Sequence, residues 1–569
     1  MSLTDYSRTL VTLVEITLPW CANSHGSAPC TATGTPCFNT YHTCADRANF
    51  SASEKTYQFC SATAPVPFPG PRPYVKSVSY LPTEITTNLT KTGRIKVEFV
   101  DEPDSDIGID PYVTSRSAWP DIPGTFFKKL LARNPNYKGA TLRILEGVLG
   151  DEYAAFVPTA NVLLETGAIG KGTFTFESVD LLAGLGDIEI PVKKSLQLLL
   201  AIDASVTELT LTDTADAAGV ASSGYLLIGD EVIQYSSYDL AQRRIYGCTR
   251  GAFSTTAAGH DASASVQPCR YFAPGNPYDH LLEMLLTDAA YDPALVDSVA
   301  FAAAKAWPGG EVDMSALLTE PRKLSDVYLA LVDWLDCKSW VAEDLQITIR
   351  RNIANKPGRE YTAWSDAATV IKSSQSSDLN ETSRKTRCAV YWEKNALGKF
   401  DDIASYSRID IGVNGDSETE YGDYQLETVY LPWLTAAGIV EETLAFYISD
   451  SLLRRMFHRR DAATLISISV DPKDGAVACG DFVTLATDEI CNPDGSPVST
   501  RFQVVRREVK GSKIDYKLLR MPVRQCCFYG PDNDALTYDT ATAAEREYGG
   551  FYADDLDKNS DGTDGAYYF

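Results

Sequence analysis

Cysteine is the residue type whose number and spacing best suit chemistry in this sequence, and five of the thirteen cysteines lie before residue 61. They follow the pattern C-x8-C-x6-C-x6-C-x15-C and comprise Cys21, Cys30, Cys37, Cys44 and Cys60. The segments between them consist largely of small and turn-forming residues, which bury little apolar surface. We therefore expect this block to be held together through its thiols.

Three kinds of thiol staple are open for this block. Disulfides suit a secreted domain, but residues 1–20 show neither the basic start nor the cleavage pattern of a signal peptide. Zinc usually takes a short C-x2-4-C knuckle, which the block does not contain. An iron–sulfur cluster takes four thiolates around a bulkier centre and accepts longer loops. His25 and His42 lie in the same loops and are able to replace a thiolate, although exposed loop histidines are the simpler interpretation.

The stretch from Pro19 to Phe59, PWCANSHGSAPCTATGTPCFNTYHTCADRANFSASEKTYQF, resembles the cysteine region of phage tail-tip proteins. Minor tail protein L of the lambda type and the tail hub proteins of gene transfer agents carry such a segment, and it holds a [4Fe-4S] cluster in them. The resemblance implies that the cluster ligands here are Cys21, Cys30, Cys37 and Cys44. Cys60 has no counterpart, so it is interpreted as a spare thiol.

The elements that must position these cysteines are mostly short strands. We expect a cysteine-rich block with a stiff proline-rich strap over 1–75, since five prolines fall within residues 64–75. Residues 76–202 alternate β-like runs with one helix at 125–134, which is typical of a β-barrel domain.

Residues 203–270 are predicted to form a small β-barrel insertion, with Gly229–Asp230 as a hairpin turn. The runs IGDEVI and TRG, followed by His260, resemble an insertion found in phage hub and baseplate proteins. His260 has no Cys, Ser or Asp partner pattern around it, so we interpret it as a structural turn residue rather than a catalytic one.

Two further domains are predicted. Residues 271–380 indicate a helix-plus-hairpin middle domain, with helices at 276–289 and 324–336 and Ser325 as the N-cap of the second. Residues 381–528 indicate a tube-like β domain with a long helix at 441–460. The basic run RRMFHRR at the end of that helix suits its C-terminal dipole, and contact with an acidic subunit surface is the alternative use.

Residues 529–569 form an acidic, tyrosine-rich tail. From residue 530 onward, ten acidic residues stand against two basic ones, and seven aromatic residues are interleaved, which argues against an independent core. The tail is either flexible or ordered by a neighbouring virion protein through its aromatic residues. DKNSDG at 557–562 matches the first half of a calcium loop, but Tyr568 stands at the twelfth position, so calcium is not expected.

Composition bounds the class of protein. A chain of 569 residues with 44% hydrophobic residues and a net charge of −25 predicts several globular domains. Frequent Gly, Pro and Tyr, scarce Met and the many short strands expected above predict an α+β, predominantly β fold. Such an acidic chain is a poor candidate for gripping DNA or an anionic membrane, and no apolar run is long enough to span a bilayer. The absence of a phosphate loop, of H-E-x-x-H and of G-x-S-x-G predicts that the chain is not an enzyme.

The resemblance implies a structural virion protein, namely the hub that closes the distal end of a phage tail tube. It further implies a homotrimeric ring at the virion tail tip, assembled in the host cytoplasm, which contacts the distal tail tube protein and other tip and fibre proteins. DNA would pass through its lumen without specific binding. Two alternatives are a receptor- or carbohydrate-binding virion protein and an iron–sulfur redox enzyme.

Overall fold

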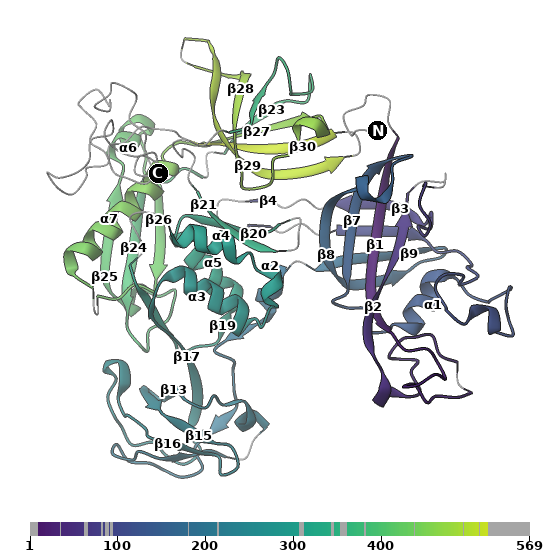
Figure 1. Cartoon of the computed structure of the whole chain (residues 1–569). Helices are drawn as coiled ribbons and strands as arrows, with labels where there is room; N and C mark the ends of the chain where they lie inside the picture. The colour runs from purple at the N-terminus through teal and green to yellow at the C-terminus, as the bar shows by residue number, and fades with distance from the viewer. Residues whose placement is uncertain are drawn as a thin grey trace, which may run out of the picture.

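The computed structural model describes residues 9–521 apart from short gaps, so the acidic tail and the pair Cys526–Cys527 lie outside the described residues. The expected turn at Glu343–Asp344 also falls in a gap. The chain is α+β and predominantly β, which confirms the predicted fold class. Figure 1 shows several sheets arranged around a central group of helices. The gaps are residues 35, 62–65, 81–83, 86–89, 92–94, 180, 213–214, 307–311, 343–345, 353–360, 381–382, 437–438, 493 and 511–512.

The first sheet is a seven-stranded barrel wall around an aromatic core. Alternating apolar residues along each strand point inward, and helix α1 (Phe126–Arg133) adds Phe126, Phe127 and Leu130 to the same core. In spatial order the strands are β2 (Ala52–Cys60), β1 (Leu10–Cys21), β7 (Thr141–Val148), β8 (Val157–Ile169), β9 (Thr173–Val179), β6 (Ile95–Val100) and β3 (Val75–Tyr80).

The proline-rich strap joins the two outer strands of this sheet. The backbone N–H of Arg72 donates to the Gln58 carbonyl at 3.0 Å, and Cys60 N–H donates to the Arg72 carbonyl at 2.7 Å. Three residues later the same segment enters β3, so it links β2 to β3. Because β1 and β2 belong to the barrel, the boundary expected between residues 75 and 76 runs through one sheet.

The insertion is a small β unit with its own apolar core, visible at the bottom of Figure 1. Gly229 turns the central hairpin with φ +56°, as the sequence predicts. The last strand continues past residue 270 into the middle domain, so the expected boundary there also falls within a strand. The strands are β11 (Leu196–Gln197), β17 (Ser265–Gly275), β13 (Gly224–Ile228) and β14 (Glu231–Tyr235), with β12 (Leu209–Thr210), β16 (Arg244–Tyr246) and β15 (Ser237–Asp239) in a second sheet.

The middle of the molecule is a helical group flanked by short hairpins. The structure confirms the helices predicted at 276–289 and 324–336, but Ser325 is not an N-cap. The second helix begins at Leu324, which places Lys323 at the cap and Ser325 inside the first turn. The elements are α2 (Leu181–Gly184), β10 (Glu189–Ile190), α3 (Pro277–Glu283) followed by a π-helical turn (Met284–Asp288), α4 (Ser298–Lys305), β18 (Met314–Leu318), β19 (Arg322–Lys323), α5 (Leu324–Trp334), β20 (Cys337–Val341) and β21 (Ile347–Arg351).

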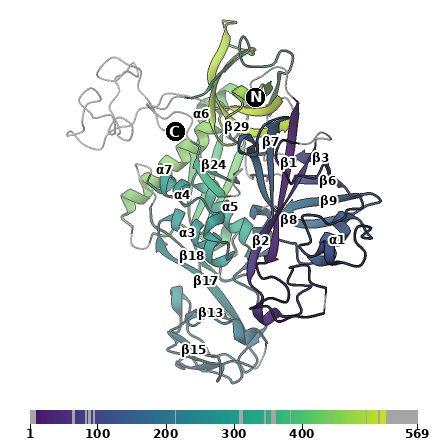
Figure 2. The same ribbon diagram turned by 45° about the vertical axis from the view of Figure 1, so that its right-hand side comes forward.

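The chain region expected as one tube-like domain divides into two sheets. The first has the order β25 (Tyr406–Val413), β24 (Arg387–Lys394) and β26 (Leu426–Leu431), and it shares one core with the middle helices and with α7 (Glu441–His458). Helix α6 (Gly415–Tyr421) joins β25 to β26. Figure 2 shows α7 beside β24, away from the barrel.

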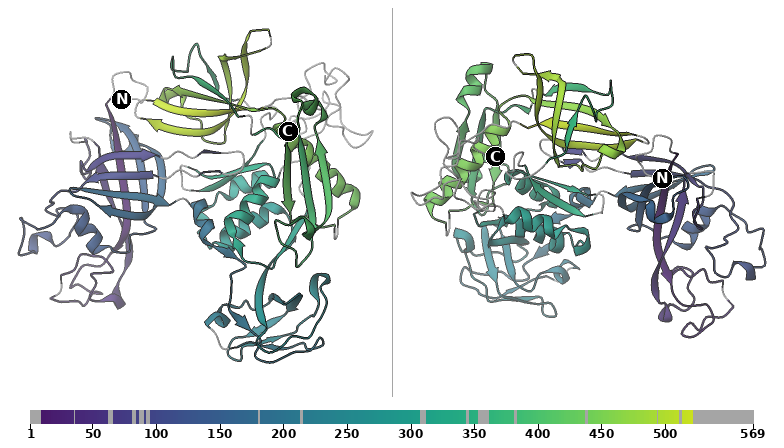
Figure 3. Two further views of the ribbon diagram at one scale, coloured as in Figure 1. Left: turned by 180° about the vertical axis from the view of Figure 1, so that it is seen from behind. Right: turned by 45° about the horizontal axis from the view of Figure 1, so that its top comes forward.

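The second sheet has eight strands and its own core. Two of its strands, β4 and β5, come from the turn between β3 and β6 of the barrel, so that this sheet links distant parts of the chain. Figure 3 shows it as a separate layer above the middle helices. The strands are β22 (Ala363–Ser365), β28 (Phe482–Cys491), β29 (Pro497–Lys510), β30 (Lys513–Arg520), β27 (Ala463–Val470), β23 (Ser376–Asn380), β4 (Glu84–Ile85) and β5 (Thr90–Lys91). Within the described part of the chain, no helix is both long enough and apolar enough to cross a bilayer.

The basic run at the end of α7 forms buried ion pairs with the middle helices. Arg455 is 3% exposed, and its guanidinium contacts Asp333 at 2.5 Å and Glu427 at 3.2 Å. Arg459 pairs with the same two carboxylates. Burial raises the pKa of Asp333, but the charges of Arg455 and Arg459 outweigh it and hold that pKa below its ordinary value. The run is therefore used within the chain to fasten α7 to α5.

We expect Arg455→Ala to destabilise the packing of α7 by about 1–3 kcal/mol, because it removes a buried cation from Asp333 and Glu427 and leaves Arg459 as their remaining partner. The matched control is Arg408→Ala, which removes solvent-accessible pairs with Glu393 and with Glu441 at the first residue of α7 and should cost about 0–1 kcal/mol. Hydrogen exchange of the α7 amides measures both effects. Equal protection in the two variants would contradict this account of the cluster.

Candidate metal centre

The cysteine block is a long loop at the end of a stiff hairpin. Strands β1 and β2 pair from Leu13↔Cys60 to Cys21↔Ala52, and residues 22–51 form the loop beyond the last pair. Figure 1 shows this loop hanging below the barrel beside α1. Because Cys21 is the last residue of β1, its thiol is positioned by the sheet, whereas the other three cysteines depend on contacts within the loop.

Asn39 fastens the loop to the end of the hairpin. Its carbonyl accepts from the Cys21 N–H at 2.8 Å, and its side-chain amide donates to the carbonyls of Cys21 at 2.9 Å and Asn23 at 3.1 Å. Asn39 has φ +53°, a left-handed conformation that asparagine accepts better than most residues. Asp46 then joins two parts of the loop by accepting from the Thr31 N–H at 2.7 Å and from the Asn49 side chain at 3.1 Å.

The barrel supplies a second anchor through the segment before α1. Arg116 donates to the Cys37 carbonyl at 2.6 Å and to Asp110 at 2.7 Å, and its guanidinium lies 4.0 Å from the ring centroid of Phe38. The Tyr112 hydroxyl accepts from the His25 N–H at 2.8 Å. The loop is thus held by polar contacts rather than by an apolar core.

The structure brings the four predicted ligands together around one cavity. Cys21, Cys30, Cys37 and Cys44 all line it, with His25 and Asn39 among the remaining residues. Burial raises the pKa of the Cys37 thiol; the Asn39 N–H, 3.3 Å from Sγ, lowers it, and the other three cysteines raise it further. A cationic group among these cysteines would stabilise the ionised form of Cys37.

The state of the four thiols is described by what they do not form. None of the eleven cysteines in the described residues forms a disulfide. Across the same residues, no three His, Cys, Asp or Glu side chains converge closely enough to bind a single metal ion. Four thiolates around one zinc would lie about 3.8 Å apart, given Zn–S bonds of about 2.3 Å. The described residues thus place four thiols around one cavity, without a disulfide and without the close convergence that a single metal ion requires.

Of the other thiol and histidines considered for this site, only His25 lines the cavity in the described residues. Cys60 is buried at the opposite end of β2, eight residues from Ala52, about 27 Å at 3.3 Å per residue. His42 is exposed in the loop, as expected, whereas His25 is half-buried and lines the cavity. His280 is buried and bonded to the Met314 carbonyl at 2.8 Å, which fits a structural role.

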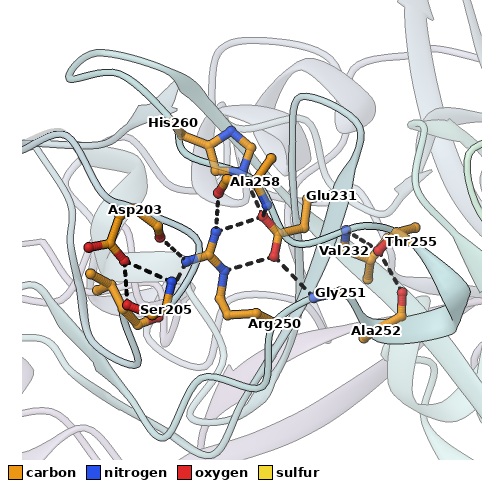
Figure 4. A network of polar contacts seen from close by, with 11 residues as sticks. Asp203, Ser205, Glu231, Val232, Arg250, Gly251, Ala252, Thr255, Ala258 and His260 are labelled. Carbon is orange, nitrogen blue, oxygen red and sulfur yellow. Dashed lines mark hydrogen bonds and ion pairs between the residues drawn. The ribbon is translucent and has the colours of Figure 1, made fainter.

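His260 belongs to a buried network at the core of the insertion, shown in Figure 4. Its Nε2 lies 2.8 Å from Glu231, and Arg250 donates to both carboxylate oxygens of Glu231 at 2.7 Å. The backbone N–H groups of Gly251 and Ala258 also donate to this carboxylate. Glu231 is not predicted from the sequence as the partner of His260, although a charged residue inside the apolar run IGDEVI is a signal of such a role.

This network is structural rather than catalytic. All the contacts to the Glu231 carboxylate come from groups that hold the loop 250–260 against β14, and no nucleophile is among them. Burial raises the pKa of Glu231, but the donors from Arg250, His260 and the backbone outweigh it and lower the pKa to about 2. Glu231 of IGDEVI, Arg250 of TRG and His260 therefore meet in the structure and hold the loop 250–260 in place.

The comparisons with known proteins are as follows. No protein-family model matches the chain, and no curated protein matches its sequence. Among solved structures, the tail protein from Neisseria meningitidis MC58 is similar with 10% identity and a TM-score of 0.37, covering 79% of this chain and 96% of that chain. The 43 kDa tail protein of prophage MuSo2 from Shewanella oneidensis has 9% identity and a TM-score of 0.37, with 79% and 94% covered. A chain of the native gene transfer agent virion has 14% identity and a TM-score of 0.30, with 57% and 81% covered.

Because the pKa of Glu231 is lowered in the fold, we predict that the stability of the loop 250–260 depends on pH. Its contribution to stability is complete above the ordinary pKa of 4.5 and is lost as the pH falls toward about 2. Glu231→Gln should remove that dependence and destabilise the insertion by about 3–5 kcal/mol at neutral pH, since Arg250 loses its buried partner. Hydrogen exchange of the β14 amides measures this. Asp230→Asn, at the exposed neighbouring position, is the control and should change little.

The shared cavity predicts loss of metal when one thiol is removed. Full-length Cys37→Ser, reconstituted anaerobically with iron and sulfide, should retain less than half of the iron of the wild type, because one of four ligands is missing. Iron and sulfide analysis and visible absorbance measure the loss. Cys491→Ser, which changes an exposed thiol on β28, should match the wild type. Full iron content in Cys37→Ser would exclude this site.

Proposed function

We propose that this chain is a structural component of a phage-type tail and assembles into a ring at the distal end of the tail tube. The observation that carries the proposal is the three-stranded sheet β25–β24–β26. Its two outer strands have no further strand partner among the described residues, and one of its faces is apolar and exposed. The resemblance of the cysteine block and of the IGDEVI, TRG and His260 motif supports the assignment to phage tails.

The exposed face of this sheet is unusually apolar. Ile409, Ile411 and Val413 alternate along β25 and are 47%, 57% and 54% exposed, and Leu426 on β26 is 52% exposed. In the sheet register, Val413 and Leu426 flank Arg387 on the same face. A contiguous apolar surface of this kind marks an interaction site in a soluble protein.

The opposite face of the sheet is already covered. Gly412, one residue away from Ile411, lies against Leu452 and Met456 of α7. Cys388 and Val390 of β24 belong to the core shared with the middle helices. The sheet is therefore stabilised by packing on one face, and its apolar face is left exposed.

The strand directions suit a head-to-tail assembly. Strand β25 is antiparallel to β24 and β26 is parallel to it, so β25 and β26 run in opposite directions. Pairing β25 of one copy with β26 of the next would form an antiparallel ladder and satisfy both open edges. Repetition of one such contact closes a ring. The resemblance suggests three copies around a lumen.

The remaining features fit a passive channel wall. A net charge of −25 would disfavour adhesion of DNA to a lumen during ejection. We assign the ring to the virion tail tip, with the distal tail tube protein and other tip and fibre proteins as partners. Cys21, Cys30, Cys37 and Cys44 would hold a [4Fe-4S] cluster, whose metal–thiolate bonds would cross-link a loop that lacks a core of its own.

The ring proposal predicts the effect of a charge on the apolar face. The wild-type chain should form a species of three times 62.2 kDa. Ile411→Asp should shift it to the monomer, because pairing of β25 with β26 of the next copy would place the carboxylate beside apolar cross-strand neighbours and remove part of its hydration. Leu200→Asp is the control, since Leu200 is 65% exposed on the insertion, away from this sheet. Mass photometry gives the mass, and thermal unfolding checks that both variants remain folded.

A trimer in Ile411→Asp would exclude this face as the ring contact. A wild type that stays monomeric up to tens of micromolar would contradict a ring made by this chain alone.

A further inference from the structure

We propose that His25 is a second-layer residue of the cysteine site and donates a hydrogen bond from Nε2 to a sulfur atom of the group bound there. This inference rests on the iron–sulfur centre of the proposed function. It concerns a residue outside the four-cysteine ligand set, and it makes His25 a positioning residue rather than a ligand.

The first observation is an unsatisfied nitrogen atom beside the thiols. His25 lines the same cavity as Cys21, Cys30, Cys37 and Cys44. Its Nε2 atom is buried and has no hydrogen-bond partner in the described structure. Leaving such a polar atom buried without a partner costs about 1–3 kcal/mol, so a partner is expected when the cavity is filled.

The second observation is that the barrel holds the ring in place. The backbone N–H of His25 donates to the Tyr112 hydroxyl at 2.8 Å, and the imidazole itself packs edge to face on the Tyr112 ring, with centroids 5.9 Å apart. Tyr112 is itself fixed, because its N–H donates to Asp110 at 2.9 Å. A ring held in this way presents Nε2 in one direction at little further entropic cost.

The chemistry of the donor set favours a hydrogen bond over a metal bond. Four thiolates complete the ligand set of a four-iron cluster and leave no iron position for a ring nitrogen. The sulfur atoms of such a cluster carry negative charge and accept hydrogen bonds. The Asn39 N–H already points at the Cys37 sulfur at 3.3 Å, so a donor from His25 would add a second contact of the same type.

A hydrogen bond to sulfur has a measurable electronic effect. It stabilises the more negative, reduced form of the cluster and raises the reduction potential. Removal of the bond should therefore lower the potential without removing the metal. A residue that only supports the loop would alter metal content or stability and leave the potential of the remaining cluster unchanged.

The loop contains its own matched control. His42 lies in the same loop but is exposed, and it does not line the cavity. The experiment compares the full-length wild type with His25→Ala, His25→Gln and His42→Ala after anaerobic reconstitution with iron and sulfide. Iron content is measured first, and the reduction potential is then followed by visible absorbance and electron paramagnetic resonance.

We expect all four proteins to bind iron. In His25→Ala, the ratio of reduced to oxidised cluster at a fixed potential should fall about tenfold, which corresponds to about 59 mV for one electron. His25→Gln keeps an N–H donor and should recover part of the difference, while His42→Ala should match the wild type.

Equal potentials in His25→Ala and the wild type would overturn the proposed hydrogen bond and leave the iron–sulfur centre intact. Loss of iron from both His25 variants, with retention in His42→Ala, would make His25 a ligand and overturn its role as a donor. A wild type that binds no iron would overturn the centre itself, together with this inference.

Discussion

The segment from residue 22 to residue 51 buries too little apolar surface to hold its own shape. The structure of the site therefore depends on hydrogen bonds that fasten this segment to the barrel. The hairpin β1–β2 extends the barrel wall as a stiff stem and ends at Cys21. Asn39 then ties the loop back to this end, and Arg116 ties it to the barrel. Hydrogen bonds hold the loop in a shape that an apolar core would otherwise have to impose. The thiols consequently face one cavity before any inorganic group is considered.

The same use of polar contacts recurs where parts of the chain meet. Glu231 and Arg250 hold the loop 250–260 of the insertion against β14, and Arg455 joins α7 to the middle helices through Asp333. Each of these buried charges has an oppositely charged partner and additional hydrogen bonds, which is the condition under which burial of a charge is tolerated. In a chain with an excess of 25 negative charges, several arginines are thus engaged within the fold.

Local patterns predicted most of the individual elements. The turn at Gly229–Asp230, the strand around Cys388 and the long helix ending at His458 all follow from turn residues, alternation and helical periodicity. Domain boundaries did not follow, because alternation shows that a strand has an apolar face but does not identify the neighbouring strand. Strand β17 illustrates this limit, since it pairs with the insertion through its first half and with β18 through its second half.

The sequence by itself determined the class of fold, because side-chain type and turn chemistry are local properties, whereas cysteine spacing left the kind of thiol staple open and the set of four ligands came from a resemblance. Only the tertiary structure decided that His25 lies in the cavity while His42 is exposed, although both stand in similar loop sequences. It also decided that Glu231 is the partner of His260 and that one face of the sheet β25–β24–β26 is left open. These outcomes depend on which distant segments pack together, and that choice is made by the summed burial and hydrogen bonding of the whole chain.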